Sequence, residues 1–237
     1  MSEHPETPAA SGAACIGIIM DGNRRWALSH GLPSMKGHAA GLAKAKDIAR
    51  HAFSHSRRID TIILYAFSTE NWNRTPEEVA YLMDLFGGAL VRELDELSRE
   101  SIRIRFIGDF ARLPEKLRAS MRKLEQESLS ADSGKTLVIA LSYGGRAEIL
   151  AATNRLLASG TKNVSADDLA AALWSAGIKD PDIIIRTGGE KRLSNFLPWQ
   201  SVYSEFFFSD SFWPDFSHAE FDAILESFAA RERRHGG

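Results

Sequence analysis

The sequence predicts an α/β fold with a mainly parallel sheet. Short apolar runs alternate with longer amphipathic ones along the chain, which is the pattern of strands connected by helices. Four of the six short runs are almost continuously apolar, as is typical of strands covered on both faces. No biased linker and no internal repeat divides the chain of 237 residues, so we expect one domain.

The expected strands follow one another in chain order. The first two read CIGIIM and TIILYAF, the fourth reads TLVIAL, and the last two read DIII and EFFF. The third reads IRIRFI, and its alternation with arginine indicates an edge or half-exposed strand. The six strands are expected at 15–20, 61–67, 102–107, 136–141, 182–185 and 205–208.

Longer segments with helical spacing lie between and after these strands. They cover residues 38–55, 76–99, 114–129, 145–158, 166–176 and 217–234. Segment 76–99 has a strong start, with a capping threonine, a proline and two acids. Gly87 and Gly88 inside it are unusual, because each glycine costs a helix about 1 kcal/mol relative to alanine. Close packing or an open groove beside this helix would explain them.

Composition excludes several classes of function. The net charge is −2, so there is no basic field to hold nucleic acid, and we expect no nucleic-acid partner. The single cysteine, Cys15, permits no intramolecular disulfide and fits a cytoplasmic setting. Residues 1–14 are small and polar and are expected to be a disordered tail rather than a signal peptide. No run approaches a membrane span, so any membrane contact would be peripheral.

Polar and glycine residues recur where the strands end. The segments after the first, second, fourth and fifth strands read DGNRRW, STENWNR, SYGGR and RTGGEKRLSN. Ligands of open parallel sheets bind beyond the carboxyl ends of the strands. Glycine and asparagine are ordinary turn residues, but their repetition with arginine along one edge of one sheet predicts an anion site.

The residue types indicate a polyphosphate ligand. Arginine matches phosphate oxygens with a fixed fork of donors, and five arginines exceed what one monophosphate needs. They are Arg24, Arg25, Arg74, Arg186 and Arg192. Two diphosphates, or one nucleotide, would balance this charge, and Asp21 and Glu205 could hold Mg²⁺ beside the phosphates.

Other ligand classes lack their motifs. The sequence has no G-x-x-x-x-G-K-[ST] loop and no G-x-G-x-x-G after a strand, so a nucleotide is not favoured. It also has no H-E-x-x-H and no cysteine cluster, which argues against zinc. The apolar stripe of segment 76–99 could instead line a groove for a hydrocarbon chain, although a core-facing helix is the simpler interpretation.

Taken together, these segments resemble the cis-prenyltransferases, above all the undecaprenyl diphosphate synthases. The match runs from Ile16 to Gly237 and is carried by MDGNRRWA, GHAAG, YAFSTENWNR, IGD, YGGR, IIRTGGEKRLSNF and WPDF. The resemblance implies that residues 15–237 form one domain with a six-stranded parallel sheet flanked by helices. It also implies a hydrophobic tunnel beside the sheet and a homodimer. The paired D-D-x-x-D motif of the all-helical prenyl synthases is absent.

The resemblance also implies roles for single residues. Asp21 would bind Mg²⁺ at an allylic diphosphate, Asn71 would assist proton removal, and Glu205 would complete the metal site, within one chain or across the dimer interface. The allylic diphosphate would contact Gly22, Asn23, Arg24, Arg25, Trp26 and His38. Residues of the segment that orders over substrate would be Ser68, Thr69, Glu70, Trp72 and Arg74. The diphosphate of isopentenyl diphosphate would contact Arg186, Arg192, Leu193 and Ser194.

The implied reaction is condensation of isopentenyl diphosphate onto an allylic primer such as farnesyl diphosphate, with a new cis double bond. Asparagine is a poor base, so a diphosphate oxygen or Asp21 is an alternative proton acceptor. Small Ala66 near the end of the second strand favours an undecaprenyl product, a lipid-carrier precursor for cell-wall synthesis. A short- or medium-chain product, a non-catalytic scaffold and a nucleotide-binding module stay open as alternatives.

Simpler interpretations exist for several of these residues. Asp21 could form an Asx turn, His38 could cap its helix, and Asn71 and Trp72 could pack a loop. Arg146 in YGGR could bind phosphate or form a structural ion pair. One departure from the family is Ser34, where many relatives have arginine four residues before the histidine of G-H-x-x-G. Lys36 or Arg24 could compensate for this lost phosphate contact.

Overall fold

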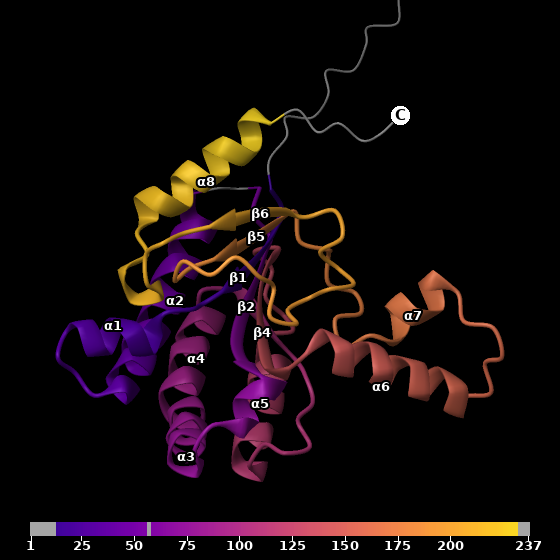
Figure 1. The fold of residues 1–237 in the computed structure, drawn as a ribbon. Helices are drawn as coiled ribbons and strands as arrows, with labels where there is room; N and C mark the ends of the chain where they lie inside the picture. The colour runs from indigo at the N-terminus through magenta and orange to yellow at the C-terminus, as the bar shows by residue number, and fades with distance from the viewer. Residues whose placement is uncertain (1–12, 56–57, 232–237) are drawn as a thin grey trace, which may run out of the picture.

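Six parallel strands form the centre of the protein (Figure 1). The computed structural model describes residues 13–55 and 58–231. The strand order is β3-β4-β2-β1-β5-β6, and every neighbouring pair is parallel. The strands are β1 (Cys15–Ile19), β2 (Thr61–Ser68), β3 (Ile102–Ile107), β4 (Lys135–Tyr143), β5 (Ile183–Arg186) and β6 (Glu205–Phe208). The predicted parallel sheet is confirmed, and β3 lies at its edge as its alternating pattern indicated.

Helices cover the sheet and extend beyond it. They are α1 (Asn23–Ser29), α2 (Ser34–His55), α3 (Pro76–Leu85), α4 (Val91–Arg99), α5 (Glu115–Glu127), α6 (Gly145–Ala158), α7 (Ala166–Ala172) and α8 (His218–Ala230). Short 3-10 turns occupy Thr69–Asn73 (η1) and Trp213–Asp215 (η3), and a π turn occupies Phe86–Leu90 (η2). Figure 1 shows α6 and α7 projecting to one side of the sheet, while α8 lies across β5 and β6. No helix in 13–55 or 58–231 has the length and apolar character to cross a membrane.

Three expected elements differ from the observed ones. Residues 22–25 were expected as a diphosphate-binding loop, but Gly22 precedes and Asn23, Arg24 and Arg25 begin helix α1. The expected helix 76–99 is interrupted by the π turn at Gly87 and Gly88, and a side chain added at either glycine would meet no atom within 4 Å. Close packing therefore does not explain these glycines. The helix expected at 166–176 ends at Ala172.

Side chains along β1 alternate between two of the buried clusters, which lie on opposite faces of the sheet. Ile16 and Ile18 face the large core beneath α2, α3, α4, α5 and α8, and Cys15 and Ile19 face a smaller one. Cys15 is fully buried and donates a weak hydrogen bond to the Lys179 carbonyl over 3.3 Å. Burial, together with the charge of Asp182, raises the pKa of its thiol. Cys15 therefore packs as a small apolar residue.

The structure describes the last two residues of the expected tail 1–14. Ala13 is buried, and the backbone N–H of Ala14 donates to Asp182 Oδ2 over 2.7 Å. The ordered chain therefore reaches at least two residues into the expected tail 1–14, and the rest of that prediction lies outside the described residues. The end of the expected helix 217–234 and the terminus of the expected domain 15–237 also lie outside them.

Candidate active site

A polar cleft of about 850 Å³ lies beyond the carboxyl ends of β1, β2 and β5. This is where the strand-end pattern predicted an anion site. The end of β2 contains a register shift around Ala66, so Tyr65 and Ala66 both reach the cleft although neighbouring strand residues normally face opposite sides. The lining also contains Asp21, Asn23, His38, Ser68, Asn71, Arg74, Arg186, Arg192 and Ser194.

Asp21 is held on several sides. Its backbone oxygen accepts from Thr187 Oγ1 over 2.8 Å and from the Trp213 N–H over 3.0 Å. Its carboxylate accepts from Arg186 Nη2 over 2.8 Å and lies 3.3 Å from Arg25 Nη2. Within the described residues, both recorded partners of the carboxylate are arginines rather than the amides of an Asx turn. This carboxylate is therefore preset beside two cations.

Gly22 allows the chain to turn from β1 directly into α1. Its φ is +105°, which glycine adopts without strain. A side chain there would also meet Phe212 at 2.8 Å. Arg24 and Arg25 then fall in the first turn of α1 and are about half exposed. Trp26 is not among the residues that line the cleft, and its Nε1 donates to Asp215 Oδ1 over 2.7 Å.

Asn23 and His38 lie where the cleft meets an apolar cavity. Among the described residues, Asn23 Oδ1 and His38 Nε2 are buried without a hydrogen-bond partner. His38 lies in the second turn of α2, so it does not cap that helix. Burial, with help from the cation of Arg74, lowers the pKa of His38. The imidazole is therefore neutral at neutral pH, and two polar atoms remain available to a ligand.

Arg186 connects three parts of the cleft. Only 4% of its side chain is exposed. Its Nη2 donates to Asp21, and its Nη1 donates to the Arg192 carbonyl over 2.5 Å and to Ser194 Oγ over 2.8 Å. Ser194 adopts φ +49°, an uncommon value for a residue with a side chain. Arg192 pairs with Glu190 and is largely exposed, whereas Leu193 packs against the smaller core.

The η1 turn after β2 is fixed by its own side chains. Ser68 Oγ accepts from the Asn71 N–H over 3.2 Å, and Asn71 Oδ1 accepts from the Ser68 N–H over 3.0 Å. Asn195 Nδ2 donates to Glu70 over 2.9 Å, and Thr69 Oγ1 donates to the same carboxylate over 3.0 Å. Burial alone would raise the pKa of Glu70, but these hydrogen bonds lower it overall. Glu70 is therefore ionised at neutral pH.

Trp72 is held in place by contacts within the protein. Its Nε1 donates to Ser142 Oγ over 3.0 Å, its ring stands edge-on to Phe67 at 5.1 Å, and Arg112 lies over it at 4.4 Å. These contacts are loop packing. Asn71 and Ser68 differ from it, since both line the polar cleft and a neighbouring open cavity of about 1050 Å³.

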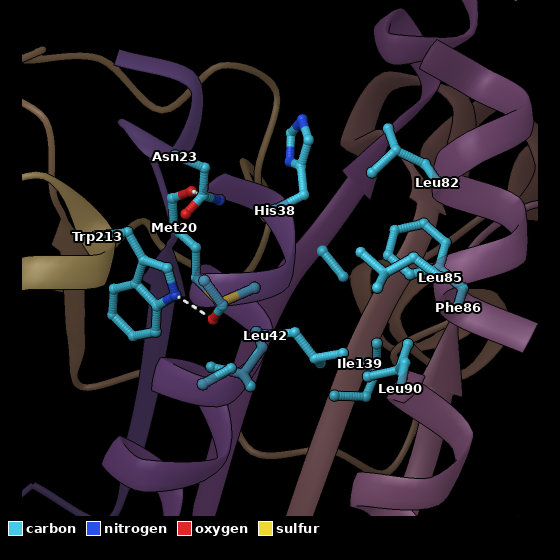
Figure 2. A pocket seen from close by; sticks show the side chains of 14 residues that line it. Met20, Asn23, His38, Leu42, Leu82, Leu85, Phe86, Leu90, Ile139 and Trp213 are labelled. Atoms are coloured by element: carbon cyan, nitrogen blue, oxygen red, sulfur yellow. Dashed lines mark hydrogen bonds between the residues drawn. The ribbon is translucent and has the colours of Figure 1, made fainter. Parts of the chain in front are cut away.

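A narrow apolar cavity, partly open to solvent, begins where the polar cleft ends (Figure 2). The two share Met20, Asn23, His38, Ala66 and Leu82. Figure 2 shows side chains from α2, α3 and the sheet pointing into this space, and the Trp213 indole donates to the Gly41 carbonyl over 2.7 Å. The remaining apolar lining is Leu42, Ala45, Leu64, Leu85, Phe86, Leu90 and Ile139.

Glu205 does not join this group within one chain. It is the first residue of β6 and pairs with Ile183, the first residue of β5. It therefore lies toward the amino end of the sheet, opposite Asp21, and it accepts a hydrogen bond from Arg231 over 2.7 Å. Across residues 13–55 and 58–231, no three histidine, cysteine or acidic side chains are placed to hold a metal. One carboxylate, Asp21, fits Mg²⁺ only if a ligand supplies further oxygens.

Two residues take part in the site in ways that the sequence did not indicate. Glu78, expected only as an acid of a helix start, lies among Arg24, His38 and Arg74. Asn195 connects η1 to the start of α6, since its Oδ1 accepts from the Arg146 N–H over 2.9 Å. For Glu78, the one available signal in the sequence was its spacing of four residues from Arg74 near a helix start.

Known proteins resemble this chain over nearly its whole length. A family model described as "Putative undecaprenyl diphosphate synthase" matches residues 19–236. An isoprenyl transferase of Brucella abortus is 47% identical over 229 residues, which are 94% of this chain and 89% of the relative. An isoprenyl transferase of Thermotoga maritima is 43% identical over 226 residues, which are 94% of this chain and 96% of the relative.

Two solved structures have the same fold. Lavandulyl diphosphate synthase from Lavandula x intermedia, in complex with dimethylallyl diphosphate, aligns with a TM-score of 0.87 and 33% identity. The alignment covers 94% of this chain and 97% of that one. A Campylobacter jejuni protein described as a probable undecaprenyl diphosphate synthase aligns with a TM-score of 0.80 and 30% identity, covering 96% and 100%.

Proposed function

The chain belongs to the undecaprenyl diphosphate synthase family of prenyltransferases, and on this premise we propose its substrates and product. The enzyme elongates farnesyl diphosphate with isopentenyl diphosphate, forming cis double bonds, and makes undecaprenyl diphosphate for cell-wall synthesis. The observation that supports this most is the continuity of the polar cleft with the apolar cavity. A diphosphate fits the first space and a hydrocarbon chain the second.

The cleft offers places for two diphosphates. Near α1, the allylic diphosphate binds beside Asp21, Asn23, Arg25 and His38, where two buried polar atoms lack partners among the described residues. Isopentenyl diphosphate binds on the side of Arg186, Arg192 and Ser194, toward the second open cavity. Arginine at both places supplies donors that suit phosphate oxygens.

The residues of the cleft supply the chemistry of each step. Asp21 would hold Mg²⁺ together with substrate oxygens, and the ion would neutralise charge on the departing diphosphate. Arg25 and Arg186 are already placed beside that carboxylate, so little reorganisation is needed when charge develops. The alkene of isopentenyl diphosphate forms a bond to C1 of the allylic chain as the bond from C1 to its diphosphate breaks. A proton then leaves C2 of the isopentenyl group. Asn71 orients this step, since its oxygen already accepts from Ser68, and a diphosphate oxygen or Asp21 takes the proton.

A homodimer accounts for the exposed β6 edge. Val202, Tyr203, Phe206 and Phe208 are all exposed there, Tyr203 to 92%. Exposed apolar groups on an edge strand favour pairing with another chain. Glu205 lies in the same stretch, so a second copy could bring it to a metal site that one chain leaves incomplete. We further propose a cytoplasmic enzyme that contacts the membrane peripherally when the product leaves.

A shorter product is the second candidate. It is favoured by the high structural similarity to lavandulyl diphosphate synthase, whose complex contains a dimethylallyl group. Ala66 at the boundary of the apolar cavity favours the longer product, because a small side chain leaves the entrance wide.

The test is incorporation of radiolabelled isopentenyl diphosphate with farnesyl diphosphate, Mg²⁺ and detergent, with products separated by length. We expect long cis products, and Asp21→Asn should lower kcat/KM by more than about a hundredfold because several kcal/mol of charge stabilisation are lost. Short products would support the second candidate. No incorporation by folded protein with any allylic primer would support a scaffold, and thermal stabilisation by ATP but not by farnesyl diphosphate would support a nucleotide-binding module.

A further inference from the structure

Glu78 is an acid among the cations of the cleft. It lies in the first turn of α3, and only 13% of its side chain is exposed. Three cationic or titratable partners reach it from different elements. Arg74 Nη1 is 2.9 Å from Oε1, His38 Nε2 is 3.5 Å from Oε1, and Arg24 Nη1 is 3.4 Å from Oε2.

These partners belong to the region that receives an anion under the proposed function. Arg74 and His38 line the polar cleft, and Arg24 shares the first turn of α1 with Arg25. Each pair of arginines is held by one carboxylate of the chain. Asp21 contacts Arg25 and Arg186, and Glu78 contacts Arg24 and Arg74. Glu78 therefore has the charge and the position of a bound anion.

Glu78 compensates the positive charge of Arg24 and Arg74, but it does not satisfy all the hydrogen-bond donors around it. Only the contact with Arg74 has the length of a good hydrogen bond, whereas those with Arg24 and His38 are long. His38 Nε2 lacks a hydrogen-bond partner among the described residues. A diphosphate has more oxygens than one carboxylate and can approach these donors together. It would thus bind the same groups with better geometry.

We propose that Glu78 is an internal anion, which holds the cations of Arg24 and Arg74 beside neutral His38 in the free enzyme and which the allylic diphosphate displaces. The inference rests on the proposed function and adds a residue that tunes substrate affinity. It also connects the head group to the chain cavity. Leu82 and Leu85 follow Glu78 by four and seven residues, so they share its face of α3, and both line the apolar cavity. Displacement of Glu78 releases the first turn of α3, the helix that forms this side of the apolar cavity.

A purely structural role predicts the opposite sign. If Glu78 serves only to orient Arg24, Arg74 and His38 for the substrate, then its removal disorders these groups and weakens anion binding. If Glu78 competes with the substrate, its removal strengthens anion binding. The sign of the change in affinity separates the two roles.

The experiment is calorimetric titration of inorganic diphosphate, with Mg²⁺ present, into the wild-type protein, Glu78→Gln and Glu77→Gln. Glu77 is the exposed neighbour, so its variant controls for the loss of one negative charge. We expect Glu78→Gln to bind about threefold to tenfold more tightly, and Glu77→Gln to stay within about twofold of wild type. Weaker binding by Glu78→Gln, or binding equal to that of Glu77→Gln, overturns the internal anion. Absence of binding by the wild-type protein instead overturns the proposed function.

A second measurement needs no variant. Hydrogen exchange of the backbone amides in residues 78–85 is followed in the wild-type protein with and without inorganic diphosphate. Faster exchange on binding supports release of this turn of α3, and slower exchange contradicts it. If diphosphate binds in that sample but exchange slows, the internal anion is contradicted while the proposed function stands.

Discussion

Arg186, the last residue of β5, donates from Nη2 to Asp21 Oδ2 over 2.8 Å across the end of the neighbouring strand β1. The arginine is almost fully buried, while the carboxylate is partly open to the cleft. A buried cation needs such a partner, because its charge is otherwise left without water or compensation. The pair therefore fixes the position of the carboxylate that faces the proposed diphosphates.

Arg186→Lys should destabilise the fold. Lysine can replace one hydrogen bond of Arg186 but cannot reach Asp21, Ser194 and the Arg192 carbonyl together. We expect the free energy of unfolding to fall by about 1–3 kcal/mol, measured by urea denaturation. Arg122→Lys, on the exposed face of α5, is the control and should change it by less than about 0.5 kcal/mol. Equal effects of the two substitutions would remove the structural role given to Arg186.

Ala66→Leu should shorten the product. Ala66 lies on the shared boundary of the polar cleft and the apolar cavity, so a larger side chain narrows the path of the growing chain. Crowding of this packed region should also lower stability by about 1–3 kcal/mol. The matched control is Ala80→Leu, on the exposed face of α3, which should leave the product distribution unchanged. The distribution is read from radiolabelled products separated by chain length.

Gly88→Ala should stabilise the protein. The position is exposed, and an added side chain meets no atom within 4 Å. Alanine loses less chain entropy on folding, so the free energy of unfolding should rise by about 0.4–1 kcal/mol. Gly22→Ala provides the contrast, because its φ of +105° and the contact with Phe212 make any side chain unfavourable. Loss of stability in both variants would show that the π turn needs its glycines for packing.

His38 should make the fold sensitive to mild acid. Burial lowers its pKa from the ordinary 6.5, so the folded protein keeps the imidazole neutral. As the pH falls below that value, the unfolded chain binds a proton that folded His38 does not, and stability falls. Between about pH 7.5 and about pH 5.5 the wild-type protein should therefore lose more unfolding free energy than His38→Gln. Parallel pH curves from urea denaturation would contradict this.

The elements of the fold were predictable because their signals are local. The apolar strands and the alternating Ile102–Ile107 strand carry their burial pattern in consecutive residues. Helix α1 was missed because it has only seven residues and its N-cap, Gly22, makes no side-chain cap. The break at Gly87 and Gly88 was visible as a helix anomaly, but whether packing or open space explained it depended on residues distant in sequence.

The site was predictable only in part. The strand-end rule brought Asp21, Asn71, Arg186 and Ser194 to one cleft, whereas His38, which also lines it, was expected only from the family resemblance. It could not indicate that Trp72 packs on Phe67 and Arg112, because those contacts depend on the course of the loops. Glu205 was expected as the first residue of the last strand, and in a parallel sheet this position lies at the amino end, away from Asp21.

Cys15 gives the protein a practical property. The thiolate is the form that reacts with alkylating reagents, and burial keeps this thiol protonated. Because the sequence contains no other cysteine, one introduced at an exposed position such as Ala80 would be labelled selectively by a maleimide dye or spin probe. Spectroscopy of that label would then follow α3 directly during turnover, without first removing a native thiol.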